Sequence, residues 1–158
     1  MIWGAIVGGI AGTLVLTTVL RAASELGWTR MDIPFLLGTA VTEDRVRAKA
    51  VGYALHFVFG LLFALAYWVI FEVVDESGLL LGAGLGLVHA LFAGSALVNV
   101  LLQVVHPRMG TGFDAAGSAP QLEPPGFLLL NYGRQTPVVT VIAHVLYGAI
   151  VGAFVSWA

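Results

Sequence analysis

Four long apolar runs divide the chain, and none of them contains a charged side chain. They cover roughly residues 2–20, 50–71, 79–105 and 137–158. A helix needs about 20 such residues to cross a hydrocarbon core of about 30 Å. Because lipid offers the backbone no hydrogen-bond partners, runs of this length favour helices over strands. The pattern predicts an all-α, four-helix transmembrane bundle that forms one integral membrane domain over residues 1–158.

The composition supports a chain that is solvated by the lipid bilayer. Hydrophobic residues make up 59% of the sequence and charged residues only 10%, whereas a soluble domain carries about 25% charged residues. The absence of cysteine excludes disulfides, thiolate metal ligands and a cysteine nucleophile. A net charge of -2 without a long basic tract gives no reason to expect nucleic acid as a partner.

The basic residues indicate how the chain crosses the membrane. All seven Lys and Arg residues fall in the connections 21–49 and 106–136. Under the positive-inside rule, both connections face the cytoplasm, while the two termini and the acidic turn around Glu76 face outside. Residues 1–4 lack the positive charge of a signal peptide, so we expect the first span to be retained. The predicted location is a prokaryotic cytoplasmic (inner) membrane.

The two halves of the chain resemble each other in the order of their features. Each half begins with a span rich in small residues, continues through a partly apolar loop and ends with a span that contains histidine. Both halves start outside, so the chain is predicted to be two similar helical hairpins in a parallel repeat, with a pseudo-two-fold axis along the membrane normal. The matching positions are Gly4 and Gly8 with Gly82 and Gly86, and His56 and Gly60 with His144 and Gly148.

Small residues recur at intervals of four along the predicted spans. Such stripes, often called glycine zippers, let helix backbones approach closely within lipid. Tight packing inside the bundle is one interpretation; the other is self-association or docking on a partner, with the first span as the outward face. The glycines concerned are Gly4, Gly8, Gly12, Gly60, Gly82, Gly86, Gly94, Gly148 and Gly152.

Histidines are the candidate functional residues within the spans. Counted at 1.5 Å per residue, His56 and His144 lie about 9 to 11 Å from the inner ends of their helices. His89 is expected near mid-membrane, in a different layer, and His106 at the membrane surface. Uncharged polar residues fall near the depth of the first two histidines. The predicted polar layer consists of Thr13, Thr17, His56, Asn99 and His144.

Three interpretations of this layer remain open. The side chains could hydrogen-bond between helices and fix their register. Alternatively, His56 and His144 could be the axial ligands of a b-type haem, with Gly60 and Gly148 making room for the porphyrin. The layer could also line a path for a small solute or a proton. No third ligand suggests a bare metal site, and no catalytic constellation is evident.

Several segments also resemble a group of short bacterial four-helix membrane proteins to which no activity is assigned. The resemblance implies the fold and the location only, so no functional residue is carried over from that group. It spans nearly the whole chain and is carried by residues 31–39, His56, His106-Pro107-Arg108, Asn131-Tyr132-Gly133-Arg134 and residues 143–148.

The sequence as a whole favours a non-enzymatic protein that needs no cofactor. We expect an accessory or assembly subunit that acts through helix packing, either as a homo-oligomer or beside a larger membrane complex. The alternatives are a haem b electron-transfer subunit and a small-solute or proton transporter.

The absence of native cysteine allows a direct test of the predicted topology. In intact cells, a membrane-impermeant maleimide is expected to modify Glu76→Cys, and to modify Pro120→Cys only after permeabilisation. Modification of position 120 but not of position 76 in intact cells would show that the orientation is reversed.

Overall fold

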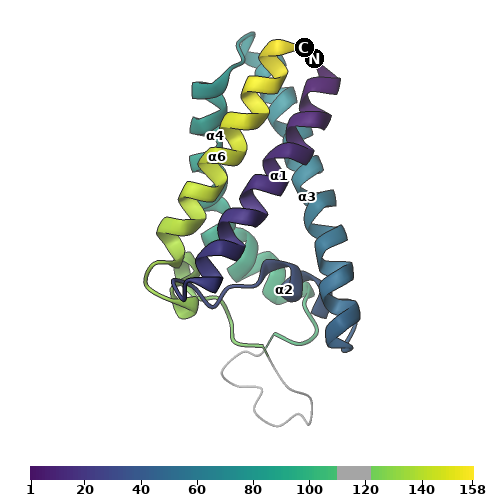
Figure 1. Cartoon of the computed structure of the whole chain (residues 1–158), viewed down its shortest axis with the longest axis vertical. Helices are drawn as coiled ribbons and strands as arrows, with labels where there is room; N and C mark the ends of the chain where they lie inside the picture. The colour runs from purple at the N-terminus through teal and green to yellow at the C-terminus, as the bar shows by residue number, and fades with distance from the viewer. Residues whose placement is uncertain (110–121) are drawn as a thin grey trace.

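The computed structural model confirms an all-α fold built on four long apolar helices. It describes residues 1–109 and 122–158, without the side chains of residues 101–103. In these ranges, four helices are long and apolar enough to cross a membrane, and they run alternately up and down (Figure 1). Residues 110–121 of the second predicted connection lie outside the described part. The long helices are α1 (Ile2–Glu25), α3 (Arg45–Val74), α4 (Leu79–Phe92), which continues as the π-helix η1 (Ala93–Leu101), and α6 (Thr136–Trp157).

Short elements lie at the end of the bundle opposite the two termini. They are α2 (Ile33–Thr39), α5 (Leu102–Val105) and the 3₁₀ segment η2 (Phe127–Tyr132). The α2 helix runs across this end of the bundle (Figure 1) and begins where Asp32 accepts a hydrogen bond from the backbone N–H of Phe35. This short apolar helix packs beneath the bundle, against α3.

The two ends of α3 differ from the predicted span. Asp44 caps its start by accepting a hydrogen bond of 2.8 Å from the N–H of Arg47. The helix therefore begins several residues before the apolar run and carries its basic first turns. It ends at Asp75, which has a φ of 52°, and Gly78 (φ 142°) completes the turn into α4. This brief turn makes α3 and α4 antiparallel.

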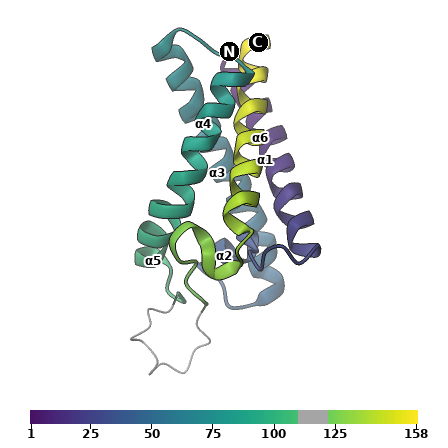
Figure 2. The ribbon, with the colours of Figure 1, turned by 90° about the vertical axis from the view of Figure 1, so that its left-hand side faces the viewer.

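Helix α6 lies between α1 and α4 in both views of the ribbon (Figures 1 and 2). Glycines make this position possible, because a Cβ atom at Gly82 would overlap the carbonyl oxygen of Gly148, and one at Gly86 would overlap that of His144. On the other side, a Cβ atom at Gly12 would lie 2.9 Å from the ring of Tyr147. The small residues therefore bring α6 into backbone contact with its two neighbours.

Most glycines of the stripes contact neighbouring helices inside the bundle. In α1, Gly4 and Gly8 face α6 at Phe154, so this stripe packs inside the bundle and does not form the outward docking face of the alternative interpretation. Gly60 of α3 faces Thr13 of α1 in the same way. The physical reason is that α1 packs between α3 and α6 and uses glycine on both contacts. Gly152 packs against Gly78, whereas Gly94 has only ordinary contacts with Leu128.

The predicted parallel repeat stays a prediction, because the two hairpins are packed differently. Helix α6 lies between two long helices, whereas α3 packs against α1 and the short α2. Aromatic side chains of α3 reach α4: the ring of Phe63 lies 3.8 Å from the ring of His89, measured between centroids. Toward the end opposite the termini, α3 and the α4–η1 segment leave space between them.

A pair of substitutions on one helix tests the glycine contacts. Gly86→Ala is expected to lower the free energy of unfolding by about 1–3 kcal/mol, since the added methyl overlaps the α6 backbone. Gly84→Ala on the same helix is the control, because it faces open space. Unfolding in mixed micelles measures both, and equal stability of the two variants would contradict the packing.

Candidate functional site: a chamber within the bundle

A chamber of about 500 Å³ lies between α3 and the α4–η1 segment. Helix α2 and the segment η2 contribute to its wall at the end opposite the termini. Most of the wall is apolar, which is typical of a site for a hydrophobic ligand. The polar side chains in the wall are Thr13, His56, His89, Thr140 and His144.

Two of these histidines are in direct contact. The rings of His89 and His144 lie 4.7 Å apart, centroid to centroid, in an edge-to-face arrangement. The Tyr67 hydroxyl lies 3.2 Å from Nδ1 of His89, and the Tyr147 ring lies 6.0 Å from the His89 ring. The expectation that His89 belongs to a separate layer is therefore wrong. A depth difference of about 5 Å, one helical turn, is within the reach of two facing side chains.

Hydrogen bonds orient His144 and Tyr147 on α6. Nδ1–H of His144 donates to the carbonyl oxygen of Thr140 at 2.8 Å, so the other ring nitrogen of the neutral imidazole is an acceptor. The Tyr147 hydroxyl donates to the carbonyl oxygen of Gly60 at 2.5 Å. This second bond ties α6 to α3 beside the chamber, so the polar groups on these two helices are held in place.

Two polar atoms in the wall have no hydrogen-bond partner among the described residues. They are Nε2 of His56 and Oγ1 of Thr140, and Thr140 is only 4% exposed. Buried polar atoms are nearly always paired, and leaving one unpaired costs about 1–3 kcal/mol. Pairing either atom with a bound group would therefore be favourable.

The predicted polar layer is only partly assembled. The hydroxyl of Thr13 donates to the Gly9 carbonyl, that of Thr17 donates to the Thr13 carbonyl, and the Asn99 amide donates to Gly94. Each of these bonds stays within one helix. Thr13 lines the chamber with His56 and His144, Thr17 lines a second cavity, and Asn99 is in the wall of neither.

A π-helix forms one wall of the chamber. In this segment each backbone turn takes in an extra residue, and such turns are frequent at functional sites. Ala93, Leu97 and Val98 of η1 line the chamber. The Asn99 amide reaches the carbonyl five residues earlier in the same segment. No sequence pattern considered above distinguishes this segment from the α-helix before it.

His106 lies below the chamber, at the end of the bundle opposite the termini, and its side chain is buried within the protein. It is 4% exposed, and it accepts the N–H of Arg108 at Nδ1 (3.1 Å). Its Nε2–H therefore donates to the carbonyl oxygen of Leu36 at 3.0 Å. The Arg108 guanidinium bonds to the Thr39 carbonyl and to Glu43 at 3.1 Å. Helix α2 packs over His106, and the hydrogen bond from His106 to the Leu36 carbonyl holds the helix in place.

Some site residues were not identified from the sequence. Tyr67, Phe63 and Tyr147 surround His89, and Thr140 carries an unpaired hydroxyl. A usable signal existed for the first of them, because Tyr67 and His89 are equally distant from the turn at Gly78 and therefore face each other in an antiparallel hairpin.

The residues in the described ranges contain no group of three or more His, Cys, Asp or Glu side chains that could hold a metal ion. No known protein family, curated protein or solved structure matches this chain.

Two threonines one turn apart on α6 test the unpaired hydroxyl. Thr140→Val is expected to raise the free energy of unfolding of the ligand-free protein by about 1–2 kcal/mol, since it removes an unsatisfied buried group. Thr136→Val is the matched control and should lower it by about 1 kcal/mol, because the Thr136 hydroxyl is bonded to Thr29 at 2.7 Å. Destabilisation by Thr140→Val equal to that of the control would contradict the assignment.

Proposed function

We propose that this chain is a non-enzymatic binding protein of a prokaryotic cytoplasmic membrane, with both termini outside. Its ligand is a hydrophobic molecule that lies in the chamber between α3 and α4. A polar group on that molecule bonds to Thr140 and His56. The proposal rests on one observation: the two residues that carry unpaired buried polar atoms both line one largely apolar cavity.

The chemistry of the two atoms limits the polar group of the ligand. A threonine hydroxyl donates and accepts, and a neutral imidazole nitrogen does one or the other according to its tautomer. A hydroxyl or carboxyl oxygen can bond to either of them. Most of the rest of the wall is apolar, so the remainder of the ligand is a hydrocarbon chain or ring.

The ligand would enter the chamber from within the bilayer. Three residues of the wall are also exposed on the outside of the bundle: Phe59 (44%), Leu62 (55%) and Val105 (70%). The chamber therefore opens through a surface that faces lipid. A molecule dissolved in the membrane can reach it without crossing water.

An accessory or assembly role is the second proposal. The glycine stripes no longer support it, because they are occupied within the bundle. Its support is the platform beneath the helices, where Arg108 joins Glu43 and the α2 backbone into a defined surface on the predicted cytoplasmic side. A homo-oligomer or a larger membrane complex could dock there.

The haem and transport alternatives stay predictions. Both proposed axial ligands, His56 and His144, line the chamber. The His144 ring is already packed against His89, so a porphyrin bound there would have to displace that contact. An absorption spectrum of the purified protein tests for haem in the same preparation.

Photolabelling tests the ligand chamber directly. The protein in vesicles is irradiated with a diazirine derivative of hexadecanol, and the labelled residues are mapped by mass spectrometry. Labelling at Leu97 and Val98 is expected to be suppressed by excess hexadecanol. Labelling at the lipid-facing Val73 and Leu80 should not be suppressed, because bulk lipid contacts are not saturable.

A filled chamber provides the control for this experiment. Ala93→Phe adds a ring to the chamber wall and should abolish the saturable labelling. Ala54→Phe adds the same ring at an exposed position of α3 outside the chamber and should leave it intact. If excess hexadecanol has no effect on Leu97 in the native protein, the proposed function is wrong.

A further inference from the structure

Two histidines in the chamber wall are in contact with each other. The rings of His89 and His144 lie 4.7 Å apart, measured between centroids, at an interplanar angle of 79°, and both residues line the chamber. One nitrogen of each ring is bonded within the protein, while the other has no hydrogen-bond partner among the described residues. The position of the proton on each ring therefore decides what this pair can bind.

The contact with Tyr67 fixes the proton on His89. Tyr67 is 4% exposed, and Nδ1 of His89, at 3.2 Å, is the one hydrogen-bond partner of its hydroxyl within the described ranges. A buried hydroxyl needs an acceptor for its proton, so Tyr67 donates to Nδ1. A neutral imidazole that accepts at Nδ1 carries its proton on Nε2. The free nitrogen of His89 is therefore a donor.

His144 has the opposite arrangement. A carbonyl oxygen can only accept, so the 2.8 Å bond to Thr140 places the proton of His144 on Nδ1 and leaves Nε2 as an acceptor. The ring of Phe63 packs against that of His89, 3.8 Å away between centroids. The chamber wall thus contains a donor, His89 Nε2–H, on a ring that touches the ring of an acceptor, His144 Nε2.

We propose that His89 and His144 together recognise a hydroxyl group of the ligand. The hydroxyl oxygen accepts Nε2–H of His89, and the hydroxyl proton is donated to Nε2 of His144. A carbonyl, ether or carboxylate oxygen has no proton to donate, so it would leave His144 unpaired. A site that hydrogen-bonds to a hydroxyl rejects analogues that lack one. This inference rests on the proposed function and specifies its ligand.

The histidine pair is a second polar position in the chamber. Thr140 and His144 are four residues apart on α6, which corresponds to about 6 Å along the helix. A ligand that uses both positions carries a hydroxyl at the histidine pair and another oxygen at Thr140 or His56. The ligand class is therefore a lipid alcohol with a second oxygen group on an otherwise apolar body.

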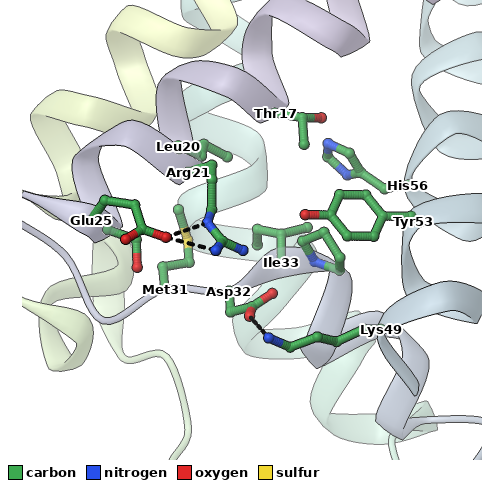
Figure 3. Close-up of a pocket in the computed structure, with 12 residues that line it drawn as sticks. Thr17, Leu20, Arg21, Glu25, Met31, Asp32, Ile33, Lys49, Tyr53 and His56 are labelled. Carbon is green, nitrogen blue, oxygen red and sulfur yellow. Dashed lines mark hydrogen bonds and ion pairs between the residues drawn. The ribbon is translucent and has the colours of Figure 1, made fainter. Parts of the chain in front are cut away.

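A tyrosine outside the chamber provides a matched control for Tyr67. A second cavity, of about 210 Å³, lies where α1, α2 and α3 meet, and its wall contains charged side chains (Figure 3). Tyr53 extends into this cavity from α3, beside His56 (Figure 3). Unlike His56, Tyr53 does not line the chamber. Tyr53→Phe therefore makes the same chemical change as Tyr67→Phe on the same helix, away from the histidine pair.

NMR of the isotopically labelled imidazole nitrogens tests the two proton positions in the ligand-free protein. His89 is expected to be protonated at Nε2 and His144 at Nδ1. Tyr67→Phe should convert His89 into a mixture of both tautomers, because Nδ1 loses its donor, whereas Tyr53→Phe should change neither ring. Protonation of His89 at Nδ1 in the native protein, or a His89 tautomer that ignores Tyr67→Phe, would overturn the inference.

Competition between two compounds tests the recognition of the hydroxyl. Hexadecanol and hexadecyl methyl ether carry an oxygen on the same hydrocarbon chain, but only the alcohol can donate a hydrogen bond. The alcohol is expected to suppress the saturable photolabelling of Leu97 at about tenfold lower concentration, since the ether leaves one buried acceptor unpaired. In His144→Phe, which removes that acceptor, the two compounds should become equivalent.

The outcomes of the competition separate this inference from the proposed function. Equal suppression by alcohol and ether in the native protein would exclude the hydroxyl assignment and leave the chamber as a site for hydrophobic molecules. A preference for the alcohol that persists in His144→Phe would place the hydroxyl elsewhere, at Thr140 or His56, and also contradict it. If His144→Phe does not fold, the tautomers and the native comparison still decide. Absence of saturable labelling would refute both proposals.

Discussion

The close approach of α6 to α1 and α4 is the contact on which the rest of the structure depends. Helices in lipid gain little from burying apolar surface, so they are held by packing and by interhelical hydrogen bonds. Gly82, Gly86 and Gly148 allow the α4 and α6 backbones to touch, and Gly8 does the same between α1 and α6. With α6 in the middle, α3 packs against α1, and the chamber occupies the space between α3 and the α4–η1 segment toward the end opposite the termini.

The chamber combines an apolar wall with unpaired buried polar atoms, and each unpaired atom lowers the stability of the ligand-free protein. Its wall is apolar, yet it contains the unpaired atoms His56 Nε2 and Thr140 Oγ1. The surrounding groups are fixed, since His144 is bonded to the Thr140 carbonyl and Tyr147 to the Gly60 carbonyl. The π-helix η1 lines one side of the chamber. Hydrogen bonds from His106 and Arg108 hold α2 in place below it. The proposal of a binding site rests on this combination of an apolar wall and a few oriented polar groups.

The sequence predicts the architecture better than it predicts the site. Uninterrupted apolar runs were sufficient for the four long helices, because lipid leaves the backbone no alternative. Depth counting could not pair His89 with His144, since it ignores side-chain reach and the direction that each helix faces. The burial of His106 depends on α2 folding beneath it, a tertiary contact between residues about 70 positions apart. The π-helix at Ala93–Leu101 follows no pattern considered in the sequence.

The central claim is that Thr140 faces a hydrophobic ligand, and nuclear Overhauser spectroscopy tests it most directly. The isotopically labelled protein is studied in deuterated detergent with added protonated hexadecanol. The account predicts cross-peaks between the Thr140 methyl group and the hydrocarbon-chain protons of hexadecanol. Cross-peaks from Thr140 to water alone, or cross-peaks between Phe59 and Leu97 that place α3 against η1 with no space between them, would contradict it.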